Sequence, residues 1–484
     1  MATTIQQKPL YTTLPVGQQI IFTVFNTGAV ESYWNVKYIA EVHITTGLSM
    51  TLGSTSTLVA TFKTTPNNAG VGIFDFRPLL ESYVSSDNTG SDQGSLSEYK
   101  TIDYSLQTPH PIHLIDRFCK TKNSLRNFAI RFKAEGSTSK TAPVLPISNS
   151  TKDSAQYLIF NGVLQHDNYL TLGELNNADA LIAGNDYGYN LSENLLYTAS
   201  SVSPAKFLSN APTTQYANIE DYGTLAFLNF LPNSTDRISF IYLVYYKNDG
   251  TTSSEQVYQG WASGGATNLA NMQSQLLYFG AFPGNLRNYS SMFQGLVTAG
   301  TIQGGYYTVQ AKNDDDEYQE LYTINVNCPN TKGYESIRLT WLNQWGVWDY
   351  YTFTKKSVRS LSTNRTTYTQ AQGTWNDSTY RIDGFKGGKK NFRVNSTEKI
   401  QVNSDFVSEA DSQWFEELVN SQEVYILNGY DASETPPYNT MTNKYVEPVL
   451  ITTSSYIRKT IANDKLMQYT FEMERNKTLT TQTS

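Results

Sequence analysis

The sequence predicts a mainly β protein built from several β-sandwich domains, with one or two short helices. Aromatic residues make up 13% of the chain, including 34 Tyr and 22 Phe. Charged residues make up 16%, below the roughly 25% of an average soluble protein. Many short segments alternate apolar and polar residues with the period of two that is typical of strands. Tyr and Thr suit half-buried pleated faces, so this composition favours sheets with polar, weakly charged surfaces.

The clearest strand pattern lies in residues 334–360. Ile337, Leu339 and Trp341 alternate with polar side chains, as in a strand with one solvated face. Gly346 follows where a turn or bulge is least costly. The segment is therefore predicted to form two strands around a glycine turn.

Three tryptophans lie within eight positions of this segment, and they carry more apolar area than is usually left in water. One interpretation places them in the core of a small β domain. The other makes the segment a stacking platform for a sugar or a protein partner. Trp345, Trp348 and Tyr350 are the candidate binding or interface residues under this second interpretation.

The length of 484 residues is typical of about three domains. We expect an N-terminal β-sandwich of the immunoglobulin or fibronectin kind in 1–150, and a middle β domain with long irregular loops in 152–330. A C-terminal β domain in 331–484 is expected to carry a short amphipathic helix at about 409–420. Ser408 and Asp411 have the spacing of a capping box for that helix.

Candidate metal and phosphate sites are incomplete in the sequence. His110 and His113 are three residues apart, but the proline between them argues against a helix and no second cluster completes four ligands. The acidic run at 313–317 lacks the alternating ligands of an EF-hand. The basic, glycine-rich segment 381–390 lacks the P-loop spacing. We therefore predict no metal and no cofactor.

No catalytic residues are predicted, and the chain is not expected to be an enzyme. The sequence has four histidines and no Gly-X-Ser-X-Gly elbow. Glycoside hydrolysis needs only two carboxylates, and the chain has 43 Asp and Glu residues. A glycan depolymerase is therefore an alternative that the sequence leaves open.

Charge and cysteine usage indicate where the protein folds. The net charge of −7 argues against a general nucleic-acid binder, and no apolar run reaches the length of a membrane span. The N-terminus lacks an apolar signal region, and Cys119 and Cys328 form no disulfide framework. We expect folding in a reducing cytosol and exit by another route, such as the release of assembled virus particles.

Four segments resemble uncharacterised structural proteins of tailed bacteriophages from marine and gut bacteria. They are Gly70–Val84, Gln344–Ser357, Gln413–Ile426 and Glu447–Thr460. The resemblance implies a virion protein of the tail or tail tip, made in the host cytoplasm, with other virion proteins and further copies of itself as partners. It consists of structural residues and implies no catalytic ones.

A carbohydrate- or receptor-binding β-sandwich protein is the second function that we consider, with a host surface glycan as its partner. A virion component should form oligomers through surfaces rich in Trp and Tyr. A lectin should expose aromatic side chains beside polar ones, and an enzyme should bring two carboxylates together in a cleft.

Overall fold

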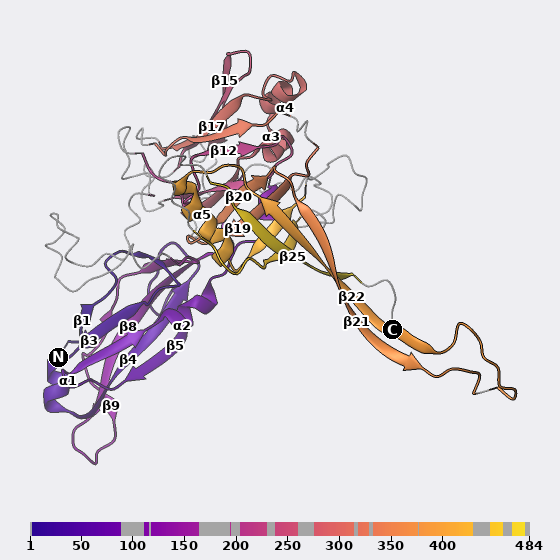
Figure 1. The fold of residues 1–484 in the computed structure, drawn as a ribbon. Coiled ribbons are helices and arrows are strands. Elements are labelled where there is room, and N and C mark those ends of the chain that lie inside the picture. Colours follow the sequence, from indigo (N-terminus) through magenta and orange to yellow (C-terminus); the bar gives the residue numbers. More distant parts are fainter. Residues whose placement is uncertain are drawn as a thin grey trace. The chain divides into compact units, whose positions relative to one another are not determined.

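A computed structural model describes residues 2–88, 111–115, 118–163, 194, 204–229, 238–259, 275–313, 318–328, 333–375, 377–428, 446–457 and 467–479. The described chain is mainly β and forms several sheets, which confirms the predicted fold class (Figure 1). It divides into two compact units. Unit 1 comprises Met1–Pro329, Leu342–Asp349 and Gly429–Thr442, and unit 2 comprises Asn330–Trp341, Tyr350–Asn428 and Asn443–Ser484.

The N-terminal part of unit 1 contains two sheets. The larger has the order β2-β11-β8-β4-β5, with β9 and β10 also paired to β8. Its strands are β2 (Thr13–Pro15), β4 (Trp34–Thr45), β5 (Thr57–Thr64), β8 (Leu125–Ser137), β9 (Leu145–Pro146), β10 (Lys152–Asp153) and β11 (Tyr157–Phe160). The smaller sheet consists of β1 (Thr4–Gln7), β3 (Ile21–Phe25) and β6 (Val71–Asp75), in the order β1-β3-β6.

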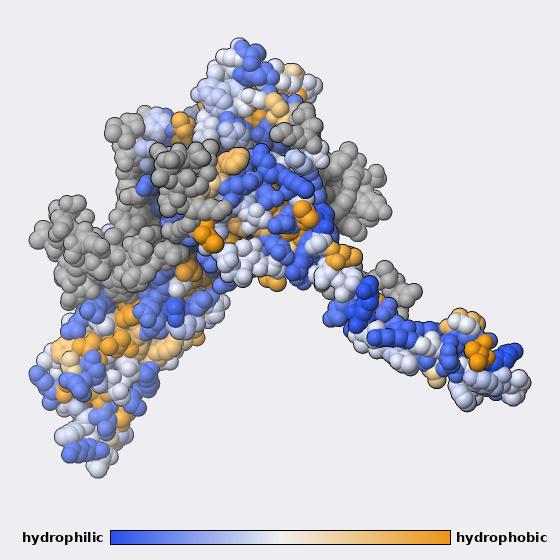
Figure 2. Space-filling model, in the orientation of Figure 1, coloured by the Kyte–Doolittle hydropathy of each residue, from blue (hydrophilic) through white to orange (hydrophobic). Residues whose placement is uncertain are grey.

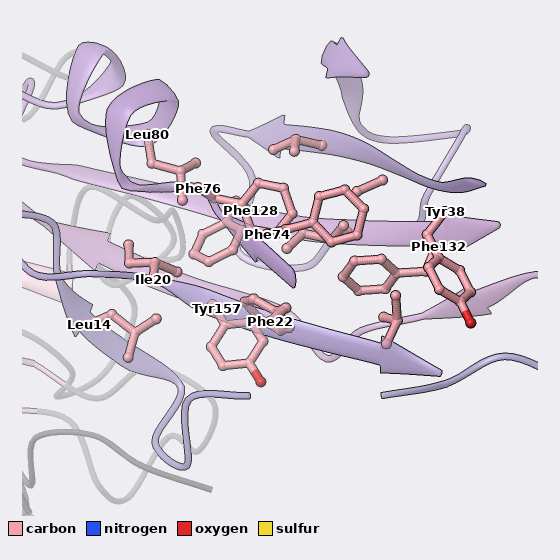
Figure 3. Packing of buried hydrophobic residues seen from close by; sticks show 14 of the residues in the cluster. Leu14, Ile20, Phe22, Tyr38, Phe74, Phe76, Leu80, Phe128, Phe132 and Tyr157 are labelled. Carbon is pink, nitrogen blue, oxygen red and sulfur yellow. The ribbon is translucent and has the colours of Figure 1, made fainter. Parts of the chain in front are cut away.

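A single hydrophobic cluster lies between these two sheets (Figure 3). Phe22 of β3 packs against Phe132 of β8, with ring centroids 5.9 Å apart, and edge-on against Tyr157 of β11 at 5.5 Å. Tyr38 is buried in the same cluster, and its hydroxyl donates to the carbonyl of Gly70 at 2.9 Å. The alternating side chains of both sheets thus fill one core, as a β-sandwich requires.

Unit 1 contains two further sheets. One has the order β12-β18-β17-β14-β15 and the other the order β13-β16-β7. Their strands are β7 (Phe118–Lys120), β12 (Thr214–Ala217), β13 (Thr224–Leu228), β14 (Phe240–Tyr246), β15 (Thr252–Gln259), β16 (Leu276–Gly280), β17 (Tyr306–Lys312) and β18 (Tyr322–Val326). Strand pairings cross position 151, since β11 pairs with β8 and β7 pairs with β16. The division into three consecutive domains remains a prediction.

Unit 2 is built on a seven-stranded sheet with the order β20-β19-β23-β24-β25-β22-β21. The strands are β19 (Ile337–Leu342), β20 (Trp348–Phe353), β21 (Val358–Gln370), β22 (Gly388–Asn403), β23 (Val424–Leu427), β24 (Val446–Ile451) and β25 (Thr470–Leu479). The predicted pair of strands in 334–360 is present as β19 and β20. The solvated face predicted for the first strand is wrong, because Arg338 and Thr340 are buried at 4% and 0% exposure. The turn between them, Leu342–Asp349, belongs to unit 1.

The predicted helix is present as α5 (Glu409–Asn420), and its capping box is formed. Ser408 Oγ accepts from the amide of Asp411 at 3.3 Å, and the Asp411 carboxylate accepts from the amide of Ser408 at 2.9 Å. Trp414 and Phe415 are buried. Trp414 packs against Trp341 of β19, with centroids 4.9 Å apart, so the apolar face of the helix covers the sheet.

The described residues contain five α-helices, where the sequence predicted one or two. The others are α1 (Thr27–Ser32), α2 (Arg77–Leu80), α3 (Pro283–Tyr289) and α4 (Ser291–Thr298), with short 3-10 turns at Glu81–Tyr83 and Ile112–Leu114. All are short, so the β character of the chain is unchanged. In the part of the chain that the structure describes, no helix has the length and apolarity needed to cross a membrane.

Candidate functional site

Strands β19 and β20 with the turn between them, called the tryptophan hairpin below, place the three candidate binding residues in different surroundings. Trp348 is 3% exposed, and its indole nitrogen donates to the carbonyl of Asp87 at 2.8 Å within unit 1. Tyr350 is 2% exposed, and the guanidinium of Arg338 lies 5.2 Å from its ring centroid within unit 2. Trp345 is partly exposed. Of the three, only Trp345 therefore presents a surface to which a ligand could bind in this structure.

The burial of Trp348 follows from the turn that precedes it. Gly346 has φ +70, a conformation that glycine adopts at no steric cost. Its amide donates to the carbonyl of Asn343 at 2.9 Å, and the Asn343 side chain accepts from the amide of Trp345 at 3.0 Å. The turn is thus fixed by its own backbone and by one asparagine.

The histidine and acidic motifs are only partly described by the structure. His113 and Cys119 are both 1% exposed, while His110 and Asp116 lie outside the described residues. Positions 314–317 of the acidic run also lie outside them. Among the residues that are described, no group of three His, Cys, Asp or Glu side chains could hold a metal ion.

The feature that stands out in unit 2 is the long hairpin of β21 and β22. The two strands pair over their whole length, from Val358 opposite Gln401 to Gln370 opposite Gly388. Strand β25 pairs with β22 only over Ser396–Asn403. Residues 364–395, called the arm below, therefore have no third strand beside them among the described residues. Figure 1 shows the arm extending away from the rest of its sheet.

The arm exposes large apolar side chains, mostly at its end. Figure 2 shows hydrophobic residues there, next to strongly hydrophilic ones. The exposed large apolar side chains of the arm are Tyr368 at 44% exposure, Trp375 at 72%, Tyr380 at 53%, Ile382 at 70%, Phe385 at 74% and Phe392 at 60%. The rings of Trp375 and Tyr380 lie beside each other, with centroids 5.1 Å apart. On soluble proteins, concentrations of exposed apolar groups are often found where partners bind.

The arm is basic, whereas the chain as a whole is acidic. Its sequence contains six Lys and Arg residues and two Asp residues, a net charge of +4 in a chain whose net charge is −7. The basic residues are Arg365, Arg381, Lys386, Lys389, Lys390 and Arg393. The remainder of the chain consequently carries −11. This segregation of charge favours an acidic partner for the arm.

An ion-pair network holds the base of the arm. Glu398 of β22 accepts from Arg359 of β21 at 2.8 Å and from Arg475 of β25 at 2.7 Å. Arg475 also binds both carboxylate oxygens of Glu447 in β24, at 2.7 and 2.6 Å. The hydrogen bonds from Arg359 and Arg475 hold the pKa of Glu398 below its ordinary value. Four strands are thus tied together where the arm leaves the sheet.

The arm and its exposed aromatic residues were not predicted as a site from the sequence. The basic, glycine-rich segment 381–390 forms the end of the arm and the start of β22. A usable signal was the Thr- and Ser-rich stretch Val358–Gln370, in which neither face is apolar. A strand without an apolar face has no core to cover, and its side chains are exposed throughout Val358–Thr369.

Comparisons with known proteins yield no family. No protein-family model matches the chain, and no curated protein matches it. Two solved structures are similar over much of the chain, each with 8% identity and a TM-score of 0.18. They are the native conformation of E. coli alpha-2-macroglobulin, with 82% of this chain and 21% of that chain covered, and Salmonella alpha-2-macroglobulin reacted with methylamine, with 97% and 22% covered. The chain thus spans about a fifth of the length of these proteins.

Proposed function

We propose that this chain is a structural virion protein of a tailed bacteriophage, part of the tail or tail tip, that assembles through contacts between its β domains. The observation that carries the proposal is the arm, a two-stranded ribbon with exposed aromatic residues at its end. An isolated two-stranded hairpin is at best marginally stable in water. Open strand edges and exposed apolar groups also promote pairing with other chains. These are the properties of a subunit whose arm is covered after assembly.

The sequence resemblance supports the same function. The segments Gly70–Val84, Gln344–Ser357, Gln413–Ile426 and Glu447–Thr460 resemble structural proteins of tailed phages. In this proposal the chain is made in the host cytoplasm and becomes part of the virion. Its partners are other virion proteins and further copies of itself.

The direct test is to locate the chain in particles. Antibodies raised against the purified protein are applied to purified phage particles that carry its gene, and bound gold label is imaged by electron microscopy. We expect label at one place on the tail and peptides of the chain in the mass spectrum of the particles. Particles that contain neither label nor peptides would refute the proposal.

Receptor binding is a second candidate, which the adjacent rings of Trp375 and Tyr380 favour. Exposed aromatic faces beside polar side chains are a common means of binding sugars. The expected observation is binding of the full chain to a bacterial surface glycan that is lost in Trp375→Ala and kept in Trp345→Ala. A glycan array without any signal for the wild-type chain would exclude binding to the glycans displayed.

A further inference from the structure

We propose that the arm of one copy binds to a second copy of this chain, on the surface that helix α5 and its flanking residues form on unit 2. This inference rests on the proposed function, since it names the partner through which the virion protein assembles. It joins two features of unit 2 that complement each other in charge and in apolar character.

The first feature is what the arm presents. Phe385 and Ile382 are at least 70% exposed. They lie beside Arg381 and Lys386, which pair with Asp377 and Asp383 at 3.3 and 3.5 Å, and the arm keeps its net charge of +4 when these two carboxylates are counted. Lys390 is held at the same end, because its ammonium group donates to the carbonyl of Phe385 at 2.8 Å. A partner must therefore offer apolar groups and negative charge side by side.

The second feature is the segment around α5, whose sequence has this combination. Asp405 pairs with Lys355 at 2.5 Å, and Asp411 accepts from the amide of Ser408 at the start of the helix. Residues 404–428 contain six acidic side chains and no Lys or Arg. The acidic residues are Asp405, Glu409, Asp411, Glu416, Glu417 and Glu423. Phe406, 65% exposed, lies just before the helix, and Ile457 is 70% exposed. The neighbour of Ile457, Tyr456, donates its hydroxyl to the carbonyl of Ser412 in α5, which fixes that segment beside the helix.

Within the described part of unit 2, the end of the arm lies away from α5 of its own chain. Figure 1 shows α5 on the body of unit 2 and the end of the arm extended away from it. The base of the arm is fixed by the pairing of β22 with β25 over Ser396–Asn403. The complementary surface is therefore reached on another copy. Because every copy has one arm and one such surface, the exchange gives a two-fold dimer, a ring, or an open filament where the rotation does not close.

Charge reversal tests this contact. In variant A, Lys386, Lys389 and Lys390 are each changed to Glu, and in variant B, Glu416 and Glu417 are each changed to Lys. Full-length proteins are compared by sedimentation velocity, with circular dichroism as the check on folding. We expect the wild type to associate, with an affinity that falls as salt rises. We expect A and B each to lose at least tenfold in affinity, and an equimolar mixture of A and B to regain association.

The matched control reverses Lys37, Lys140 and Lys152, three exposed lysines of unit 1, and should associate as the wild type does. Phe385→Ser removes an apolar group without changing charge and should also weaken association. Association of A at wild-type affinity, or failure of the A and B mixture to associate, overturns the proposed contact. Self-association that survives in A while the chain is found in particles would refute this contact and leave the proposed function standing. A chain that stays monomeric and binds only another virion protein would also refute this contact and leave the proposed function standing.

Discussion

Glu398 and Arg475 lie on adjacent strands at the base of the arm, with a carboxylate oxygen and a guanidinium nitrogen 2.7 Å apart. Glu398 also binds Arg359 on its other side. The arm can extend from the sheet because this network and the β22–β25 pairing fix the residues that adjoin it.

Glu398→Gln is expected to destabilise unit 2 by about 1–2 kcal/mol, since hydrogen bonds to charged groups are worth more than neutral ones and these are partly solvated. Urea unfolding followed by far-UV circular dichroism measures the change. Glu472→Gln is the control, because its ion pair with Lys399 is longer, at 3.3 Å, and more exposed. Equal effects of the two substitutions would argue against a special role for Glu398.

The same network has a pH dependence. Since the pKa of Glu398 is lowered in the folded protein, the unfolded chain binds its proton at a higher pH than the folded one. The stabilisation is therefore complete above the ordinary Glu pKa of about 4.3 and is lost as pH falls below it. We expect the stability difference between wild type and Glu398→Gln to shrink between about pH 4.5 and pH 3. A difference that is constant over this range would contradict the cause assigned to the shift.

The two types of tryptophan environment in unit 2 can be separated by substitution. Trp414 is 1% exposed and packs on Trp341, so Trp414→Ala should cost about 3–5 kcal/mol of stability. Trp375 is 72% exposed, and Trp375→Ala should stay within about 0.5 kcal/mol of the wild type. Chemical denaturation of the two variants measures both values. A large loss for Trp375→Ala would mean that the end of the arm has a structural role within its own chain.

Gly346 tests the turn of the tryptophan hairpin. A Cβ atom at this position would lie 1.5 Å from the carbonyl oxygen of Asn161. Gly346→Ala should therefore prevent normal packing and cost more than the roughly 1–2 kcal/mol of a left-handed residue alone. Gly250→Ala is the matched control, because Gly250 has φ +84 and open space around it. Equal melting temperatures of the two variants would show that Asn161 does not restrict the turn.

His43 gives unit 1 a separate pH response. Burial is the main cause that lowers the pKa of His43, and its Nδ1 lies 3.2 Å from Ser56 Oγ. The unfolded chain takes up this proton near pH 6.5, and the folded chain only at lower pH, so stability should fall as pH drops below about 6.5. Thermal unfolding of wild type and His43→Gln between pH 7 and pH 5 measures the difference. Parallel pH profiles would contradict a buried neutral His43.

The main elements could be predicted from the sequence because they follow local rules. The capping box at Ser408 and the apolar face of Trp414 and Phe415 were sufficient for α5. The alternation in Ile337–Leu342 was sufficient for β19. Both signals come from residues close in the sequence. For α5 the signal also reports which face is buried, whereas for β19 it does not, because Arg338 and Thr340 are buried as well.

The surroundings of Trp345, Trp348 and Tyr350 could not be predicted, because they depend on distant residues. Trp348 is buried against Asp87, which precedes it by 261 positions. The arm was not predicted for a different reason, which lies in its own strands. Its strands have no apolar face, and a pattern search for strands looks for one. The exposure of Trp375 and Phe385 becomes informative only once the pairing is known, because no third strand lies beside the ribbon among the described residues.

The central claim is that this chain assembles with itself, and the mass of the wild-type protein in solution tests it most directly. Multi-angle light scattering over a wide range of concentrations should give a mass that rises above the 54.3 kDa of one chain. It should level off at a whole multiple of that mass where the exchange closes into a dimer or ring, and keep rising where it builds an open filament. A mass of one chain at every concentration would contradict self-assembly.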